Sequence, residues 1–197
     1  YVKLVGQEGS FDTIIDDVSV SMWVRLQEVE NYSDTTFFQI YSRSNGKIIL
    51  WLNASRQILY LWRWNDLGSN LVVTQADIAA ATLTSKSHTH LVFRINNSGM
   101  QLFINGSPKI GFTSVIPSWG VNRTMDINFG VEENNGSLGK FLNGWIHDIS
   151  IWDTYLNQST ISEIYNEGEP SNILELRSTN LKYYHGCSEK NFDSSQN

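Results

Sequence analysis

The segment FLNGWIHDISIWDTYLNQSTISEIYNEG (residues 141–168) combines the pattern of a long strand with that of a short helix. From Trp145 to Trp152 the side chains alternate between two kinds of surroundings, which is the period of a half-buried strand. The alternation places Trp145, His147, Ile149 and Ile151 on one face and Ile146, Asp148, Ser150 and Trp152 on the other. We therefore expect one long strand here.

The second half of this segment carries the start and stop signals of a helix. Asn157 is the expected N-cap, and Leu156 in front of it can pack on Ile161 as a hydrophobic staple. Gly168, followed by Pro170, is the expected end. The sequence thus predicts a single short helix directly after the long strand.

Three segments of the chain resemble one known family. The segment at 141–168 is similar to the closing strand and helix of the laminin-G-like, concanavalin A-like jelly-roll superfamily. HTHLVFRINNSGMQLFINGS at 88–107 resembles a hairpin of that family, and VSVSMWVRL at 18–26 resembles one of its early strands. The resemblance covers residues 1–168 and implies an all-β fold, a two-sheet antiparallel jelly-roll sandwich with one short C-terminal helix. It indicates a fold rather than a function.

The rest of the chain reads as short strands separated by turn signals about every 8 to 12 residues, the pattern of an antiparallel sandwich. We expect strands at residues 1–5, 18–26, 36–42, 47–53, 58–64, 71–74, 89–95, 100–104, 109–113, 125–129 and 145–152. Residues 75–87 are expected to be irregular, with a helical turn at 77–81, and residues 132–140 are expected to form a Gly/Asn-rich turn region.

Length and charge restrict the classes of protein. A chain of 197 residues with 41% hydrophobic residues and seven tryptophans fits one large β domain with a sizeable core. The net charge of −6, without a cluster of Lys and Arg, argues against nucleic acid and anionic membranes as partners. No apolar run reaches the roughly 18 residues that span a bilayer, so we predict no membrane insertion. We expect an extracellular or surface-exposed protein.

The C-terminal region departs from the expected end of the domain. Residues 1–170 are the expected laminin-G-like sandwich, and residues 171–197 are an extension. Within the extension, LKYYH at 181–185 and NFDSSQN at 191–197 resemble the first strand and loop of a laminin-G-like domain. Four arrangements are open: a circular permutation, one unit of a tandem array, donation of the strand to the next subunit, or folding back in cis.

Strand donation has a consequence for assembly. A donated strand covers an open sheet edge, and head-to-tail repetition of that contact gives an open filament. The partners that this predicts are copies of the protein or neighbouring repeats, bound through residues 181–197.

The acidic residues do not have the spacing of an active site. Glycosidases need two carboxyl groups roughly 5 to 10 Å apart across the sugar. The resemblance implies a Glu-x-Asp-x-x-Glu strand for that task, and this spacing is absent. Nucleophile sets, phosphate-binding loops and zinc spacings are also absent from the sequence. We predict no catalytic residues and no enzymatic activity.

The resemblance implies calcium as a candidate cofactor, bound by loop oxygens at the rim of the sandwich. The candidate ligands are Asp148 in the long strand and Asp193 in the C-terminal loop. Two departures weaken the site, because the Asp-Glu pair of the family is His147-Asp148 here and the glycine of the loop is Gln196. Turn formation and strand-end hydrogen bonding are the alternative roles of these carboxylates.

Aromatic residues form a candidate glycan-binding platform. Tyr60, Trp62 and Trp64 share one face of an expected strand, and Trp119 follows in a loop. Flat apolar rings with polar edges suit sugar rings. Core packing is the more common role of such residues.

Asn-x-Ser/Thr sequons are frequent. The chain has seven of them, where its composition alone predicts roughly three. They begin at Asn31, Asn53, Asn96, Asn105, Asn122, Asn135 and Asn157. All lie in or beside expected turns, where glycans can project, although Asn is also a good turn residue in its own right.

These observations predict a non-enzymatic, glycosylated structural module on the outside of a cell, a building block of a tandem array, appendage or filament assembled by inter-unit strand contacts. The alternative is a carbohydrate-binding, lectin-like module.

Overall fold

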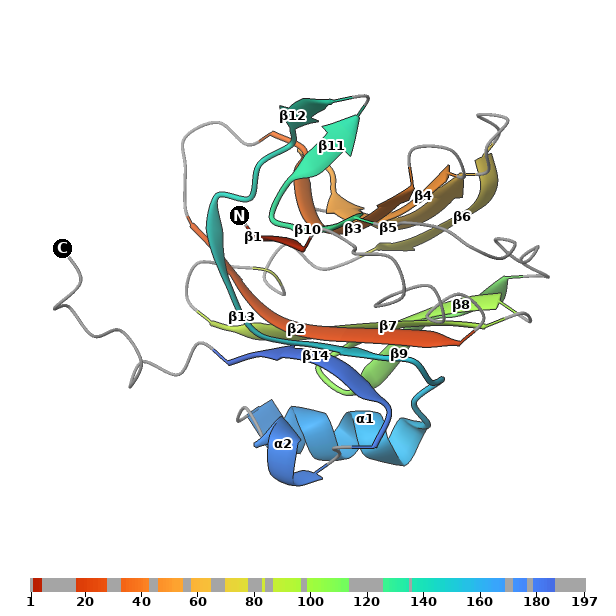
Figure 1. Ribbon diagram of the computed structural model, residues 1–197, viewed down its shortest axis with the longest axis vertical. Coiled ribbons are helices and arrows are strands. Elements are labelled where there is room, and N and C mark those ends of the chain that lie inside the picture. The colour runs from red at the N-terminus through yellow and green to blue at the C-terminus, as the bar shows by residue number, and fades with distance from the viewer. Residues whose placement is uncertain are drawn as a thin grey trace, which may run out of the picture.

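The protein is a sandwich of two antiparallel β-sheets in the computed structural model (Figure 1). The structure describes residues 2–4, 17–27, 33–42, 46–54, 58–64, 70–77, 83, 87–96, 99–113, 126–134, 136–168, 172–176 and 179–186. The predicted all-β jelly roll is confirmed. None of the described helices is both long and apolar enough to cross a membrane.

The first sheet has six strands in the order β1-β10-β3-β4-β5-β6. Its strands are β1 (Val2–Leu4), β10 (Asp126–Phe129), β3 (Thr35–Ser42), β4 (Gly46–Leu52), β5 (Ile58–Trp64) and β6 (Asn70–Asp77). Strand β6 includes residues 75–77, so the start of the stretch predicted to be irregular continues a strand. The helical turn predicted at 77–81 lies largely outside the described residues.

The second sheet also has six strands, in the order β14-β13-β2-β7-β8-β9. Its strands are β14 (Leu181–His185), β13 (Gly144–Trp152), β2 (Val18–Leu26), β7 (Thr89–Asn96), β8 (Gly99–Ile104) and β9 (Ser107–Thr113). Strand β2 lies in the middle, between β13 and β7. This central position explains why β2 is buried along almost its whole length.

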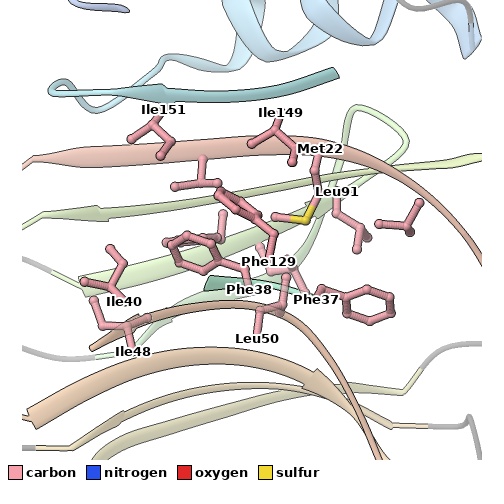
Figure 2. Close-up of a cluster of buried hydrophobic side chains, with 14 of the residues drawn as sticks. Met22, Phe37, Phe38, Ile40, Ile48, Leu50, Leu91, Phe129, Ile149 and Ile151 are labelled. Atoms are coloured by element: carbon pink, nitrogen blue, oxygen red, sulfur yellow. The ribbon is translucent and has the colours of Figure 1, made fainter. Parts of the chain in front are cut away.

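The core fills the space between the two sheets (Figure 2). Phe38 of the first sheet packs on Phe93 of the second, with ring centroids 4.8 Å apart, and on Phe129 at 5.3 Å. Met22 and Ile149 reach the same cluster from the second sheet. Each such fully buried side chain contributes about 1.5–3 kcal/mol to stability. The core therefore fixes which face of each strand points inward.

A helix covers the outer face of the second sheet. Helix α1 (Gln158–Tyr165) begins at Asn157, whose Oδ1 accepts a hydrogen bond from the Thr160 main-chain N–H at 2.9 Å. Leu156 and Ile161 are buried together with Trp152 beneath the helix, as expected for a hydrophobic staple. The predicted helix and its N-cap are confirmed.

The helix ends earlier than predicted. Asn166 is its C-cap in a left-handed conformation, with φ 43°, and a 3₁₀ turn, η1 (Asn166–Gly168), follows. Asn tolerates this conformation better than most residues, so glycine is not required at the end of the helix. A second short helix that the sequence did not predict, α2 (Ile173–Leu176), comes next.

The C-terminal strand β14 pairs with β13 of the same chain (Figure 1). The pairing is antiparallel and aligns His185 with Ile149 and Tyr183 with Ile151. Within this chain the C-terminal strand thus folds back onto the sandwich, while permutation, tandem linkage and donation to a second subunit remain predictions. Residues 187–197, which include Asp193 and Gln196, lie outside the described residues.

The alternation predicted for β13 breaks at Asp148. His147 is aligned with Trp23 and Ser150 with Ser21, so two residues of β13 oppose the single residue Met22 of β2. Asp148 has φ 47°, which identifies a β-bulge. The prediction that His147 and Asp148 lie on opposite faces is therefore wrong.

Two short strands lie within the stretch 132–140, which was predicted to be a turn region, and they pair as a small hairpin. It consists of β11 (Glu132–Asn134) and β12 (Ser137–Gly139). Glu133 is buried, and the Gln39 side chain donates to its carbonyl at 2.8 Å and accepts from its N–H at 2.8 Å. Hydrogen bonds to a residue distant in sequence thus hold the backbone in an extended conformation where the composition favours turns.

Candidate functional site

The outer face of the second sheet carries a group of aromatic, histidine and charged side chains next to helix α1. We call this group the outer-face cluster. It comprises Trp23, Arg25, His88, His90, Trp145, His147, Asp148, Tyr165 and Tyr184. Strand alternation and register bring the members together, because Trp23 is aligned with both His147 and His90, and Arg25 is aligned with Trp145.

Trp23 lies at the centre of the cluster and is only 2% exposed. Its ring stacks on Tyr165 of α1 with centroids 5.9 Å apart, and it contacts the rings of His90 at 4.9 Å and His147 at 6.3 Å. Gly106 permits the close approach of the helix, because a Cβ there would lie 2.9 Å from Tyr165 Cδ1. Trp23 therefore forms the floor of the cluster.

His90 is a buried, neutral member. Its Nε2 is 2.7 Å from Ser21 Oγ, and its main-chain N–H donates to Asn105 Oδ1 at 2.9 Å. Burial lowers the pKa of His90 to about 3. No described carboxylate hydrogen-bonds its Nδ1, which is buried without a partner among the described residues. The Ser21–His90 pair therefore has the character of a buried structural contact.

A chain of hydrogen bonds runs from the C-terminal strand to the surface. Tyr184 donates its hydroxyl hydrogen to Asp148 Oδ1 at 2.9 Å, and Asp148 Oδ2 is 2.8 Å from His147 Nδ1. His147 Nε2 is in turn 2.6 Å from His88 Nδ1. Since an ionised carboxylate only accepts, His147 Nδ1 carries the hydrogen of the contact with Asp148.

The ionisation of Asp148 follows from these contacts. Partial burial acts to raise the pKa of Asp148, but the hydrogen bonds from His147 and Tyr184, together with the nearby His185, lower it. The net effect places the pKa of Asp148 below its usual value. Asp148 is therefore a carboxylate at neutral pH, and it fixes the orientation of the His147 ring.

The exposed edge of the cluster is a tryptophan–arginine pair. The Trp145 side chain is 48% exposed, and the Cζ atom of Arg25 lies 4.2 Å from the centroid of its ring. Arg25 Nε is buried and has no hydrogen-bond partner among the described residues. A half-exposed apolar ring beside a cationic donor is an arrangement that suits a ligand with both apolar and polar faces.

The profile of the concanavalin A-like lectin/glucanases superfamily matches residues 1–162. The chain belongs to this superfamily. The match covers every described strand except β14, so the C-terminal strand lies outside the part that the superfamily profile accounts for. The comparison with curated protein sequences gives no match.

Several solved structures share the fold. The binding domain of botulinum neurotoxin DC, solved in complex with rat synaptotagmin II, has a TM-score of 0.63 and 20% identity over 90% of this chain. The same domain in complex with SialylT has a TM-score of 0.61 and 18% identity over 90% of this chain. A third structure comes from work on botulinum neurotoxin type C, whose cell entry is described as dependent upon interaction with two ganglioside molecules. It has a TM-score of 0.61 and 18% identity over 87% of this chain.

These similarities concern only part of each neurotoxin domain. This chain covers 41%, 40% and 41% of the three neighbours, respectively. At such low identity the likeness shows the jelly-roll fold of the superfamily and no more.

The glycan-binding platform predicted from the sequence remains a prediction for this superfamily member. Tyr60, Trp62 and Trp64 lie on β5, where their register partners on β4 are Trp51, Ile49 and Lys47. Their side chains, and the whole of Trp119, lie outside the described part of the structure.

The predicted calcium ligands are not brought together in the described residues. Both carboxylate oxygens of Asp148 already accept hydrogen bonds from protein groups, and Asp193 is not described. Among the described residues, no three His, Cys, Asp or Glu side chains are grouped so that they could hold a metal ion. Calcium binding by this superfamily member remains a prediction.

Four of the seven predicted glycosylation sites are described. Asn157 is exposed at the start of α1, whereas Asn53, Asn96 and Asn105 are half-buried. The side-chain oxygen of Asn96 accepts from the Gly99 N–H at 3.2 Å. Asn31, Asn122 and Asn135 lie outside the described residues.

Sequence reasoning did not find the outer-face cluster. It singled out Asp148 but not Trp145, Arg25 or His88. One signal was present, since Trp145 and His147 share a face of the expected strand. The partners of these two residues depend on strand register, which no local pattern specifies.

Proposed function

We propose that this protein is a non-enzymatic, carbohydrate-binding module of the lectin type that acts outside the cell and contacts glycans through the outer-face cluster. The observation that carries the proposal is the half-exposed Trp145 ring, with the Arg25 guanidinium 4.2 Å from its centroid. Sugar rings have apolar faces that stack on such aromatic surfaces, and hydroxyl or carboxylate groups that accept hydrogen bonds from arginine.

The neighbouring side chains add polar groups that could orient a ligand. His147 is on the same face of β13 as Trp145, and its ring is held in place by Asp148. His88 is exposed beside it. A binding site usually combines apolar surface with a few fixed polar groups, and this part of the cluster offers both.

The comparisons support a glycan as the first class of ligand to test. Two of the similar structures are described in terms of sugar ligands, namely SialylT and ganglioside molecules. Those ligands are properties of the neurotoxin domains, of which this chain covers about two-fifths. Extension of sugar binding to this chain rests on the Trp145–Arg25 pair.

The predicted absence of enzymatic activity is supported by the comparisons, because two of the similar solved structures are described as binding domains. Glucanases occur in the same superfamily, and they need two carboxyl groups roughly 5 to 10 Å apart. The outer-face cluster contains a single carboxylate, Asp148, whose two oxygens hydrogen-bond to His147 and Tyr184. The site is therefore suited to binding rather than to hydrolysis.

Assembly into an array or filament has less support. That prediction rested on an unfilled sheet edge, and strand β14 of the same chain occupies the edge beside β13. Glycan binding is therefore the preferred function.

A glycan array with five proteins tests this proposal. The wild type is compared with Trp145→Ala, Arg25→Ala and Trp64→Ala, and with Leu174→Ala, which alters an apolar side chain of similar exposure on α2. We expect the first two substitutions to weaken binding at least tenfold and Leu174→Ala to leave it unchanged. A wild type that binds no glycan would overturn the proposal, and loss of binding only in Trp64→Ala would move the site to β5.

A further inference from the structure

Two imidazole nitrogens of the outer-face cluster converge on one point at the surface. His88 Nδ1 and His147 Nε2 are 2.6 Å apart, and the two ring centroids are 4.6 Å apart with a tilt of 57°. Two nitrogen lone pairs repel each other at this separation, so one of the two nitrogens carries a hydrogen and donates it to the other. A metal ion can replace that hydrogen only if the two nitrogens move apart.

The contact between Asp148 and His147 determines which nitrogen is available. Asp148 Oδ2 accepts the hydrogen of His147 Nδ1 at 2.8 Å, so the neutral His147 ring has its lone pair on Nε2. That lone pair points at His88. Metal-binding histidines are commonly held in this way, with a carboxylate on the second ring nitrogen, because it fixes the tautomer and increases the basicity of the ligand atom.

We propose that His88 Nδ1 and His147 Nε2 bind a divalent transition-metal ion such as Zn²⁺, with Asp148 supporting His147 from the other side. Imidazole nitrogen suits zinc, copper and nickel, whereas calcium prefers oxygen. The site is therefore distinct in chemistry from the calcium site predicted from the sequence. It does not depend on glycan binding.

The pair needs only a small opening to accept the ion. Zinc–nitrogen bonds of about 2.0–2.1 Å in a tetrahedral arrangement place the two nitrogens about 3.3 Å apart, so they must separate by about 0.7 Å. We assign this movement to His88, which is the exposed member of the pair and precedes β7. His147 stays in place between Asp148 and the ring of Trp23.

Proton balance is preserved in this step. In the neutral pair His88 carries its hydrogen on Nδ1, and metal binding requires that hydrogen to be on Nε2 instead. Exchange with water achieves the shift without net release of a proton. Because the described residues offer no third protein ligand, water or a bound ligand completes the coordination.

The binding of zinc to tag-free protein tests the proposal directly. Titration calorimetry with ZnCl₂ at pH 7.5 compares the wild type with His88→Gln, His147→Gln, Asp148→Asn and the control His185→Gln. We expect one Zn²⁺ per chain, at least tenfold weaker binding in the first two variants, and at least tenfold weaker binding in Asp148→Asn. The control removes a histidine of β14 outside the pair, and its affinity should match the wild type.

A second measurement covers the case in which a variant does not fold. In the wild type, the imidazole ¹⁵N signals of His88 and His147 should shift on addition of Zn²⁺, while those of buried His90 and of His185 stay in place. Unshifted signals from the pair, absence of zinc binding, full affinity in both His→Gln variants, or displacement of zinc by excess Ca²⁺ would each overturn the proposal. None of these results bears on glycan binding, which the glycan array tests separately. EDTA is added to the array to remove zinc.

Discussion

The hydroxyl group of Tyr184 donates a hydrogen bond to Asp148 Oδ1 at 2.9 Å, and this contact joins the C-terminal strand to the bulge of β13. The two residues are 36 positions apart, on strands that pair within one chain. The extension is thereby connected to the histidines of the outer-face cluster, because the other oxygen of Asp148 contacts His147.

Removal of the Tyr184 hydroxyl should destabilise the protein. In Tyr184→Phe the buried Asp148 carboxylate loses one of its two described partners, and a hydrogen bond to a charged group contributes about 1.5–3 kcal/mol. Because Tyr184 is only partly buried, we expect a loss near the lower end of that range. Urea denaturation at pH 7 measures it, with Tyr165→Phe as the control. Equal stability of Tyr184→Phe and wild type would contradict the hydrogen bond.

Pairing of β14 in cis predicts a monomer. A chain that fills its own sheet edge has no need of a strand from a second copy. Light scattering at tens of micromolar protein should give the mass of one chain, 22.4 kDa. Filaments in electron micrographs, or dimers that vanish on deletion of residues 179–186, would instead restore strand donation.

The stability of the protein should fall in mild acid because of His90. Its pKa is about 3 in the folded state, below the value near 6.5 expected after unfolding, so the unfolded chain binds the extra proton first. The contribution of His90 is fully present above pH 6.5 and is lost as the pH falls towards 3.

Replacement of the histidine isolates this effect. Between pH 6.5 and pH 4.5 the wild type should lose about 2 kcal/mol more unfolding free energy than His90→Gln, which cannot take up the proton. Urea denaturation at several pH values gives both curves. Parallel curves would show that His90 is not responsible for the loss.

Two substitutions of Asn157 separate its cap from its sequon. Asn157→Ala removes the oxygen that accepts the Thr160 N–H, at an expected cost of about 1 kcal/mol, whereas Asn157→Asp retains the acceptor and should have near wild-type stability. Both changes abolish the Asn157 sequon. For protein produced in eukaryotic cells, a lower mass of both variants than of the wild type would show that Asn157 is glycosylated. The stability of all three proteins is measured separately, after deglycosylation.

Local patterns were sufficient for most of the fold. The bounds of β2 and β5 agree with the predicted strands, because alternation and turn residues mark both ends. The N-cap at Asn157 could also be predicted, since its contact with Thr160 spans only three residues. Such features depend on interactions within a few residues and are therefore visible in one sequence.

The candidate site could not be predicted in the same way. Ser21 and His90 are 69 residues apart, and only the register of β2 against β7 brings them together. The bulge at Asp148 was also hidden, because a positive φ is unusual for an aspartate inside a strand and glycine is absent there. Without the bulge, His147 and Asp148 point to opposite faces, and the hydrogen-bonded chain to His88 does not exist.

The central position of β2 determines when this strand can pair during synthesis on the ribosome. This strand is synthesised before both of its neighbours, β7 and β13, which leave the exit tunnel later. Until then the nascent chain carries a nine-residue, largely apolar strand with both edges unpaired. Non-local pairing of this kind slows folding and leaves apolar, aggregation-prone surface exposed. Production of the folded protein should therefore depend strongly on chaperones and on growth temperature.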